Sequence, residues 1–188
     1  MEFVPAAAPR PALRPLRELG TLPADWRRAP RGGRRHELRA GEALYATLTD
    51  LRPHGRLAVA HARGAHWLFE SERDGAAVAV REGGSGRPVA WLRADGTDGA
   101  CVLWAGRETF HWSGARLWMR RWAFRAADGR PLAGFHVRPM RPRPSGSLAF
   151  EPGAAELPHA PLLATLGWHL AVRALDAVAT GAAAGMAG

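Results

Sequence analysis

The residues of this sequence with the most evident binding chemistry are arginines. Two segments, HWSGARLWMRRWAF (111–124) and HVRPMRPR (136–143), each carry several. A planar guanidinium group suits phosphate because it donates paired hydrogen bonds. We predict that hairpin pairing gathers these side chains into one anion-binding patch for an anionic phospholipid or another phosphorylated ligand. Its members are Arg116, Arg120, Arg121, Arg138, Arg141 and Arg143. The alternative is an ordinary arginine-rich surface.

A second group of polar side chains follows a helical spacing near the C-terminus. His169, Arg173 and Asp176 are four and three residues apart, which places them on one helix face. Arg173 and Asp176 can then form an ion pair. The flanking residues are apolar, so we expect this polar stripe to face the mouth of a folded interior or to bond neighbouring strands. An enzyme of unknown type that uses this mouth remains an alternative function.

The rest of the sequence gives little support for catalysis or for bound cofactors. The chain has no lysine, which excludes a Walker A phosphate loop and a pyridoxal Schiff base. Cys101 is the only cysteine, so no internal disulfide and no cysteine-rich zinc site is expected. Four aspartates precede glycine and are read as turn formers. We therefore predict no catalytic residue, no metal and no cofactor, and favour a non-enzymatic binding or scaffold module.

The composition describes a basic chain of one domain. Its 188 residues carry a formal net charge of +9, and every basic side chain is an arginine. Isoleucine, asparagine and glutamine are also missing, a pattern typical of a GC-rich genome. Such a charge attracts anionic lipid, acidic proteins or nucleic acid. A protein partner is possible, and nucleic-acid binding through a basic N-terminal arm is a further alternative that we rank lower. No signal peptide is recognisable, so we expect a cytoplasmic protein that is peripheral at the membrane at most.

The chain divides into three regions by composition. Residues 1–34 are rich in proline, arginine and glycine, and are predicted to form a flexible arm. Residues 35–180 are predicted to form the folded domain, and residues 181–188 a short alanine- and glycine-rich tail.

The elements of the folded domain are predicted from its periodicity. Short apolar runs separated by Asp-Gly turns indicate antiparallel strands between residues 36 and 150. Aromatic residues two apart lie on one face of a strand, and we expect them to form an inner wall. They are Trp67, Phe69, Trp118, Trp122 and Phe124.

The C-terminal segment from about residue 161 to 180 is predicted to be one long helix. It is apolar around most of its circumference, and such a helix is buried. The economical way to bury it is to wrap the strands around it. The predicted fold is therefore mainly β, with about 12 strands in a closed antiparallel barrel around a central hydrophobic helix.

Several segments resemble a known family over about residues 36–180. They are YATLTDL (45–51), HWLFES (66–71), VAVREGGSGRPVAWL (78–92), WAFRAADGRPLAGF (122–135) and LAFEPGAAELPHAPLLATLGWHLAVRALDA (148–177). Together they are similar to the Tubby C-terminal-like superfamily, which includes LURP-one-related and scramblase-like proteins. The resemblance implies a closed barrel threaded by its C-terminal helix. It also implies a phosphoinositide-binding adaptor or a membrane-linked role, with arginines alone in place of the family's lysine and arginine lipid site.

Overall fold

The computed structural model of the chain describes residues 12–30, 33–51, 56–72, 77–94, 100–115, 120–138 and 144–185. Side chains are described as far as residue 177, with the exception of Ala115. These ranges contain twelve strands, two short 3₁₀ helices and one long α-helix.

The strands run through nearly the whole described chain. They are β1 Ala24–Arg28, β2 Arg35–Ala40, β3 Ala43–Asp50, β4 Leu57–Ala62, β5 Ala65–Ser71, β6 Ala77–Glu82, β7 Pro88–Ala94, β8 Cys101–Ala105, β9 Glu108–Ala115, β10 Arg121–Ala126, β11 Pro131–Arg138 and β12 Ser145–Phe150. The helices are η1 Leu16–Leu19, η4 Ala154–Glu156 and α1 Ala160–Gly185.

The twelve strands close into an antiparallel barrel. Each strand pairs with its neighbours in sequence, and β1 pairs with β12 to complete the ring. The closing register places Ala24 opposite Leu148 and Trp26 opposite Gly146. Closure pairs the backbone of every strand on both sides, so the described sheet has no open edge. The predicted fold class is confirmed.

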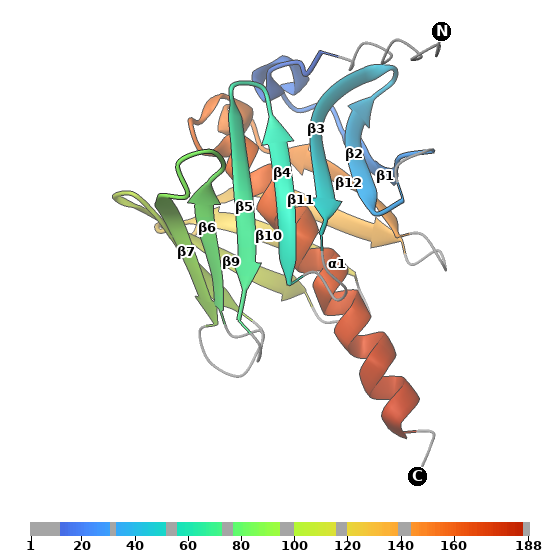
Figure 1. Ribbon diagram of the computed structural model, residues 1–188. Coiled ribbons are helices and arrows are strands. Elements are labelled where there is room, and N and C mark those ends of the chain that lie inside the picture. The colour runs from blue at the N-terminus through green and yellow to red at the C-terminus, as the bar shows by residue number, and fades with distance from the viewer. Residues whose placement is uncertain are drawn as a thin grey trace, which may run out of the picture.

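Helix α1 passes through the barrel. Figure 1 shows it entering at the end covered by η1 and η4 and continuing well beyond the opposite opening. We call the opening from which α1 emerges the exit end. Within the barrel its leucines and Trp168 are buried, and the Trp168 ring stacks on Trp26 of β1 at a centroid distance of 5.6 Å.

Small side chains on the inner wall leave room for this helix. Strand β4 turns Ala58, Ala60 and Ala62 inward, and all three are buried. Larger rings fill the wall where β9, β10 and β11 pack together. Trp112 lies 4.7 Å from Phe124 and 5.4 Å from Phe135 between ring centroids. The interior is therefore a packed core and not a channel.

The predicted aromatic wall is confirmed for most of its members. Phe69, Trp122 and Phe124 are buried, whereas Trp67 is only partly buried because it lies near the rim of the barrel. Trp118 lies outside the described residues.

The prediction of a flexible arm over residues 1–34 is wrong for its second half. Residues 24–28 form β1, and the buried Leu16 and Leu19 of η1 pack into the core. Trp26 explains the difference, because its burial against Trp168 anchors a segment otherwise rich in arginine. Helix α1 also extends through residue 185, so the predicted tail from 181 is helical over its first five residues.

We predict that Gly167→Ala destabilises the protein. A methyl group at this position of α1 would overlap the Phe135 ring. That ring is fixed between Trp112 and Phe124, so it cannot move aside cheaply. Alanine normally stabilises a helix by about 1 kcal/mol over glycine, but the overlap should reverse the sign and cost about 1–3 kcal/mol.

Guanidinium unfolding of both proteins measures this difference. Gly181→Ala, in the part of α1 beyond the barrel, is the control and should be neutral or mildly stabilising. A Gly167→Ala protein as stable as its parent would contradict the close packing of α1 against β11.

Candidate functional site

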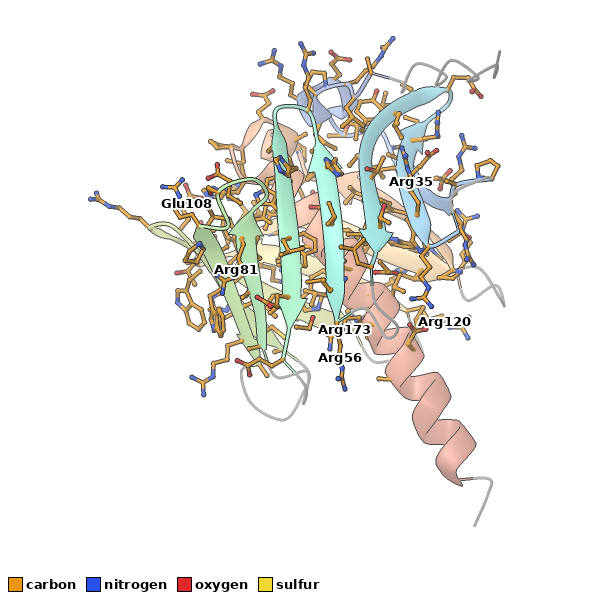
Figure 2. The ribbon with its side chains drawn as sticks, in the orientation of Figure 1. Arg35, Arg56, Arg81, Glu108, Arg120 and Arg173 are labelled. Carbon is orange, nitrogen blue, oxygen red and sulfur yellow. The ribbon has the colours of Figure 1, made fainter. Side chains whose placement is uncertain are left out.

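Arginines gather at the exit end of the barrel. In an up-and-down barrel every second connection lies at the same end, so one set of strand ends shares this opening. Within one residue of those ends, or on α1 beside them, lie ten arginines among the described residues, which we call the exit-end arginines. They are Arg27, Arg28, Arg34, Arg35, Arg56, Arg93, Arg120, Arg121, Arg138 and Arg173. Figure 2 shows Arg56, Arg120 and Arg173 close to the emerging helix.

Few acidic groups neutralise these arginines. By the same criterion, the described acidic residues at this end are Asp50, Glu70, Glu72 and Asp176. Arg138 also reaches Asp25 of β1 at 3.3 Å between Nη2 and Oδ1, and Arg35 pairs with Glu37. Elsewhere arginines lie beside carboxylates more regularly. Examples are Arg14–Glu18, Arg39–Glu37, Arg87–Glu82 and Arg130–Asp128.

Three of the six predicted anion ligands are part of this group. Arg121 begins β10, Arg138 ends β11, and Arg120 directly precedes Arg121. Arg120 and Arg121 are exposed, and Arg120 has a φ of 51°, an unusual angle for a residue with a side chain. Arg116, Arg141 and Arg143 lie outside the described residues.

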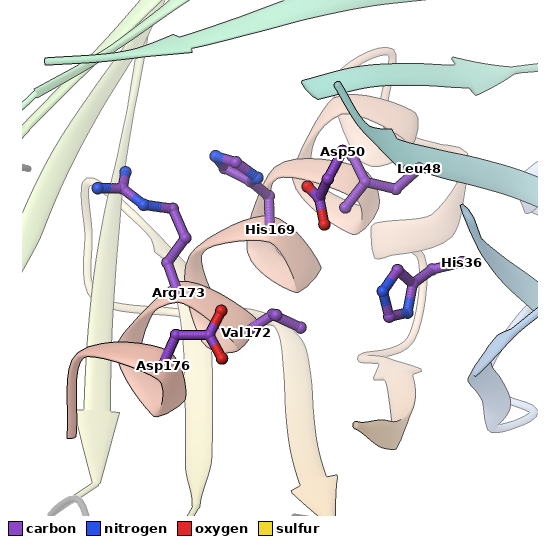
Figure 3. A pocket seen from close by; sticks show the side chains of 7 residues that line it. All are labelled: His36, Leu48, Asp50, His169, Val172, Arg173 and Asp176. Carbon is purple, nitrogen blue, oxygen red and sulfur yellow. The ribbon is translucent and has the colours of Figure 1, made fainter. Parts of the chain in front are cut away.

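The predicted polar stripe of α1 reaches the same end. Figure 3 shows His169, Arg173 and Asp176 lining a small pocket with residues of β2 and β3. Arg173 donates from Nη1 to Ser71 Oγ of β5 at 2.7 Å, and that hydroxyl lies 3.5 Å from His169 Nε2. In Figure 3 the Arg173 guanidinium and the Asp176 carboxylate point to different sides of the helix. The Ser71 hydroxyl of β5 thus accepts a hydrogen bond from Arg173 of the polar stripe.

Burial keeps the imidazoles of this pocket neutral. The His169 ring is almost fully buried against Phe69. Burial, helped by the Arg173 charge, lowers the pKa of His169 to about 3. Burial and Arg28 likewise lower the pKa of His36 to about 4. An imidazole with so low a pKa is a weak base at neutral pH, so the arrangement does not favour activation of the Ser71 hydroxyl.

Two carboxylates face each other across the pocket, Asp50 from the end of β3 and Asp176 from α1. Burial first, and then the Asp176 charge, raise the pKa of Asp50 to about 6, against the opposing effect of Arg34. Burial also lowers the pKa of Arg173. The cavity volume is about 10 Å³, which is room for about one water molecule. The pocket therefore lies where the helix leaves the barrel and does not admit a substrate in this conformation.

Sequence reasoning missed several members of the site. Arg28 and Arg34 were assigned to the arm, and Arg35 was passed over at the start of the folded domain, although all three flank the β1–β2 connection. Arg56 and Arg93 were passed over because they stand singly in sequence. Because alternate hairpin turns lie at the same end of a barrel, counting the turns would have predicted that these five arginines share one end.

Two further features of the described part of the chain concern metal binding and membrane spanning. Its histidines, cysteine and carboxylates form no cluster of three or more that could bind a metal ion. None of its helices combines the length and the apolar character needed to cross a bilayer. Comparisons with protein-family models, curated proteins and solved structures give no match for this chain.

We predict that Asp50→Asn stabilises the protein in a pH-dependent way. The raised pKa means that the folded state binds the Asp50 proton more tightly than the unfolded chain does. Folding stability is therefore lost as the pH rises from the ordinary value of 3.8 through about 6. The variant should match its parent below about pH 4 and gain about 1–2 kcal/mol above about pH 6.5, allowing for partial exposure.

Chemical unfolding across this pH range gives the difference in unfolding free energy between the Asp50→Asn variant and its parent as a function of pH. His36 and His169 affect both proteins alike, so they cancel in that difference. Glu156→Gln, at an exposed carboxylate, is the control for the loss of one negative charge. A difference curve for Asp50→Asn that does not change with pH would show that Asp50 is not held in a buried position beside another carboxylate.

Proposed function

We propose that the protein is a non-enzymatic binding module whose exit-end arginines receive an anionic, phosphate-bearing ligand. The favoured source is the headgroup layer of an anionic membrane, with a soluble phosphorylated molecule as the other source of the same chemistry. We propose that the protein acts in the cytoplasm, at the periphery of that membrane. The observation that carries the proposal is the excess of ten arginines over four acidic residues among the described residues at one end of the barrel.

The physical argument rests on concentration of charge. Each arginine near an anionic surface contributes about 1 kcal/mol of attraction, and salt screens this contribution. Arg120 and Arg121 are exposed, and neither forms an ion pair with a described residue. Both can therefore turn toward a phosphate without breaking an existing contact. The resemblance to Tubby C-terminal-like proteins, some of which bind phosphoinositides, agrees with a ligand of this class.

The structure gives less support to a reaction at the barrel mouth. The pocket around His169 has almost no free volume, and its imidazoles are weak bases. A binding role needs neither an open cavity nor a base, because flexible arginines at a rim suffice.

We predict that the position of the arginines matters, and not the net charge alone. A triple variant with Arg120, Arg121 and Arg138 changed to glutamine should lose about 10- to 100-fold in affinity for phosphatidylserine-containing vesicles at low salt. The matched control changes Arg17, Arg63 and Arg130, all exposed and away from the exit end, to glutamine. It removes the same charge and should bind nearly as well as the parent.

Vesicle sedimentation at graded phosphatidylserine content, at low and high salt, measures both variants. Competition by soluble polyphosphate identifies phosphate as the recognised group, whereas failure to compete points to the bilayer as a whole. Equal losses in the two variants would reduce the effect to net charge. No binding by the parent protein at low salt would refute the proposal.

A further inference from the structure

Two tryptophans lie exposed on the outer wall of the barrel. Trp91 of β7 is 40% exposed and Trp104 of β8 is 44% exposed. The strand register places them directly opposite each other. Among the other described tryptophans, Trp67 is partly buried and the rest are buried in the core. The exposed pair stands out because large rings on a sheet normally gain stability by turning inward.

Cationic side chains follow in the next row of the same face. Arg93, Val102, His111 and Arg125 are aligned across β7, β8, β9 and β10 by the strand register. This row lies two residues along each strand from the tryptophan row, a separation of about 7 Å. Arg93 and Arg125 are exposed, and this row contains no carboxylate. The face therefore sets positive charge beside an aromatic pair.

A shallow groove adjoins this cationic row. Its floor consists of small side chains that the register sets side by side, namely Ser113, Ala123, Gly134 and Ala149. Arg125 lines one side of it, and Arg121 and His136 line the other. The groove has a volume of about 570 Å³, enough for an extended chain to lie against the sheet. Arg121 and Arg125 thus flank a groove that lies beyond the cationic row, as seen from the tryptophans.

We propose that this face binds single-stranded nucleic acid. Bases stack on Trp91 and Trp104, and the neighbouring phosphates pair with Arg93 and Arg125. Neighbouring strands lie about 4.8 Å apart, so the two rings are spaced closely enough to receive successive bases of one strand. The distance of about 7 Å between the aromatic and the cationic rows suits the offset between a base and its phosphate.

Other occupants of the tryptophan pair fit the face less well. Ala79 and Thr109 flank the pair in its own row, so the rings have no large apolar neighbour in that row with which to enter a bilayer. The positive charge around the rings also opposes contact with a second copy of the same surface. The inference goes beyond the proposed function because its recognition element is the tryptophan pair on the outer wall, although Arg93 and Arg121 also belong to the exit-end arginines.

Fluorescence anisotropy with a labelled thymidine oligonucleotide tests this proposal. A labelled abasic oligonucleotide of the same length carries the same phosphates without bases. The parent protein should bind the thymidine oligonucleotide at least tenfold more tightly than the abasic one. Trp91→Ala and Trp104→Ala should each weaken thymidine binding about tenfold and leave abasic binding unchanged, whereas Trp→Phe at either position should retain most of the affinity.

Controls separate stacking from general loss of apolar surface and from misfolding. The double change Leu22→Ala and Leu51→Ala removes other exposed apolar side chains and should leave binding unchanged. An unaltered thermal transition shows that each variant folds. Arg125→Gln should weaken the binding of both oligonucleotides, because it removes a phosphate contact.

Three outcomes would overturn the inference. The first is equal affinity for thymidine and abasic oligonucleotides. The second is a loss of vesicle binding, with oligonucleotide binding intact, in the tryptophan variants, which would make the pair a membrane contact. The third is a change from dimer to monomer in those variants by light scattering, which would make it a self-association surface. Failure of the vesicle experiment on the exit-end arginines leaves this proposal standing.

Discussion

The structure depends on the insertion of α1 into the barrel. A twelve-stranded ring is wide, and its inner wall carries rings and leucines that water would otherwise contact. The helix fills that space with Leu162, Leu163, Leu166, Trp168 and Leu170, which are buried. At about 1.5–3 kcal/mol for each such side chain, their burial is comparable with the whole net stability of a domain, about 5–15 kcal/mol. The inward alanines of β4 and the stacking of Trp26 on Trp168 both contribute to the packing of α1 inside the barrel.

The insertion of α1 also determines where polar side chains occur along the helix and which groups they bond. Thr165, deep in the barrel, bonds back to carbonyl oxygens of its own helix at Pro161 and Leu162. His169 and Arg173 occur where the helix nears the opening and can reach Ser71. Charged side chains are therefore confined to the rim and to the outer wall. The two surfaces for which we propose ligands are both places where a filled barrel can carry positive charge without burying it.

The periodicity of the sequence was sufficient to predict the barrel, the central helix and most of the inner wall. Strand β1 was missed because Ala24–Arg28 has a single large apolar side chain. Trp26 stabilises this strand by stacking on Trp168, a residue that is far away in the sequence. The sequence pattern also did not show that Trp91 and Trp104 face outward. Both faces of these strands carry apolar residues, so only the inward turn of Leu92 and Leu103 onto the core decides which face is outside. The exit-end arginines come from separate hairpins, and closure of the ring is what makes them neighbours.

Removal of the helix is the most direct test of this account. A chain that ends at Glu156 keeps all twelve strands but lacks α1, whereas a chain that ends at Ala177 keeps every described buried residue of the helix. Thermal unfolding followed by near-ultraviolet circular dichroism compares both chains with the full protein. The account predicts a cooperative transition for the chain ending at Ala177 and none for the chain ending at Glu156. A soluble chain ending at Glu156 with an intact cooperative transition would contradict it.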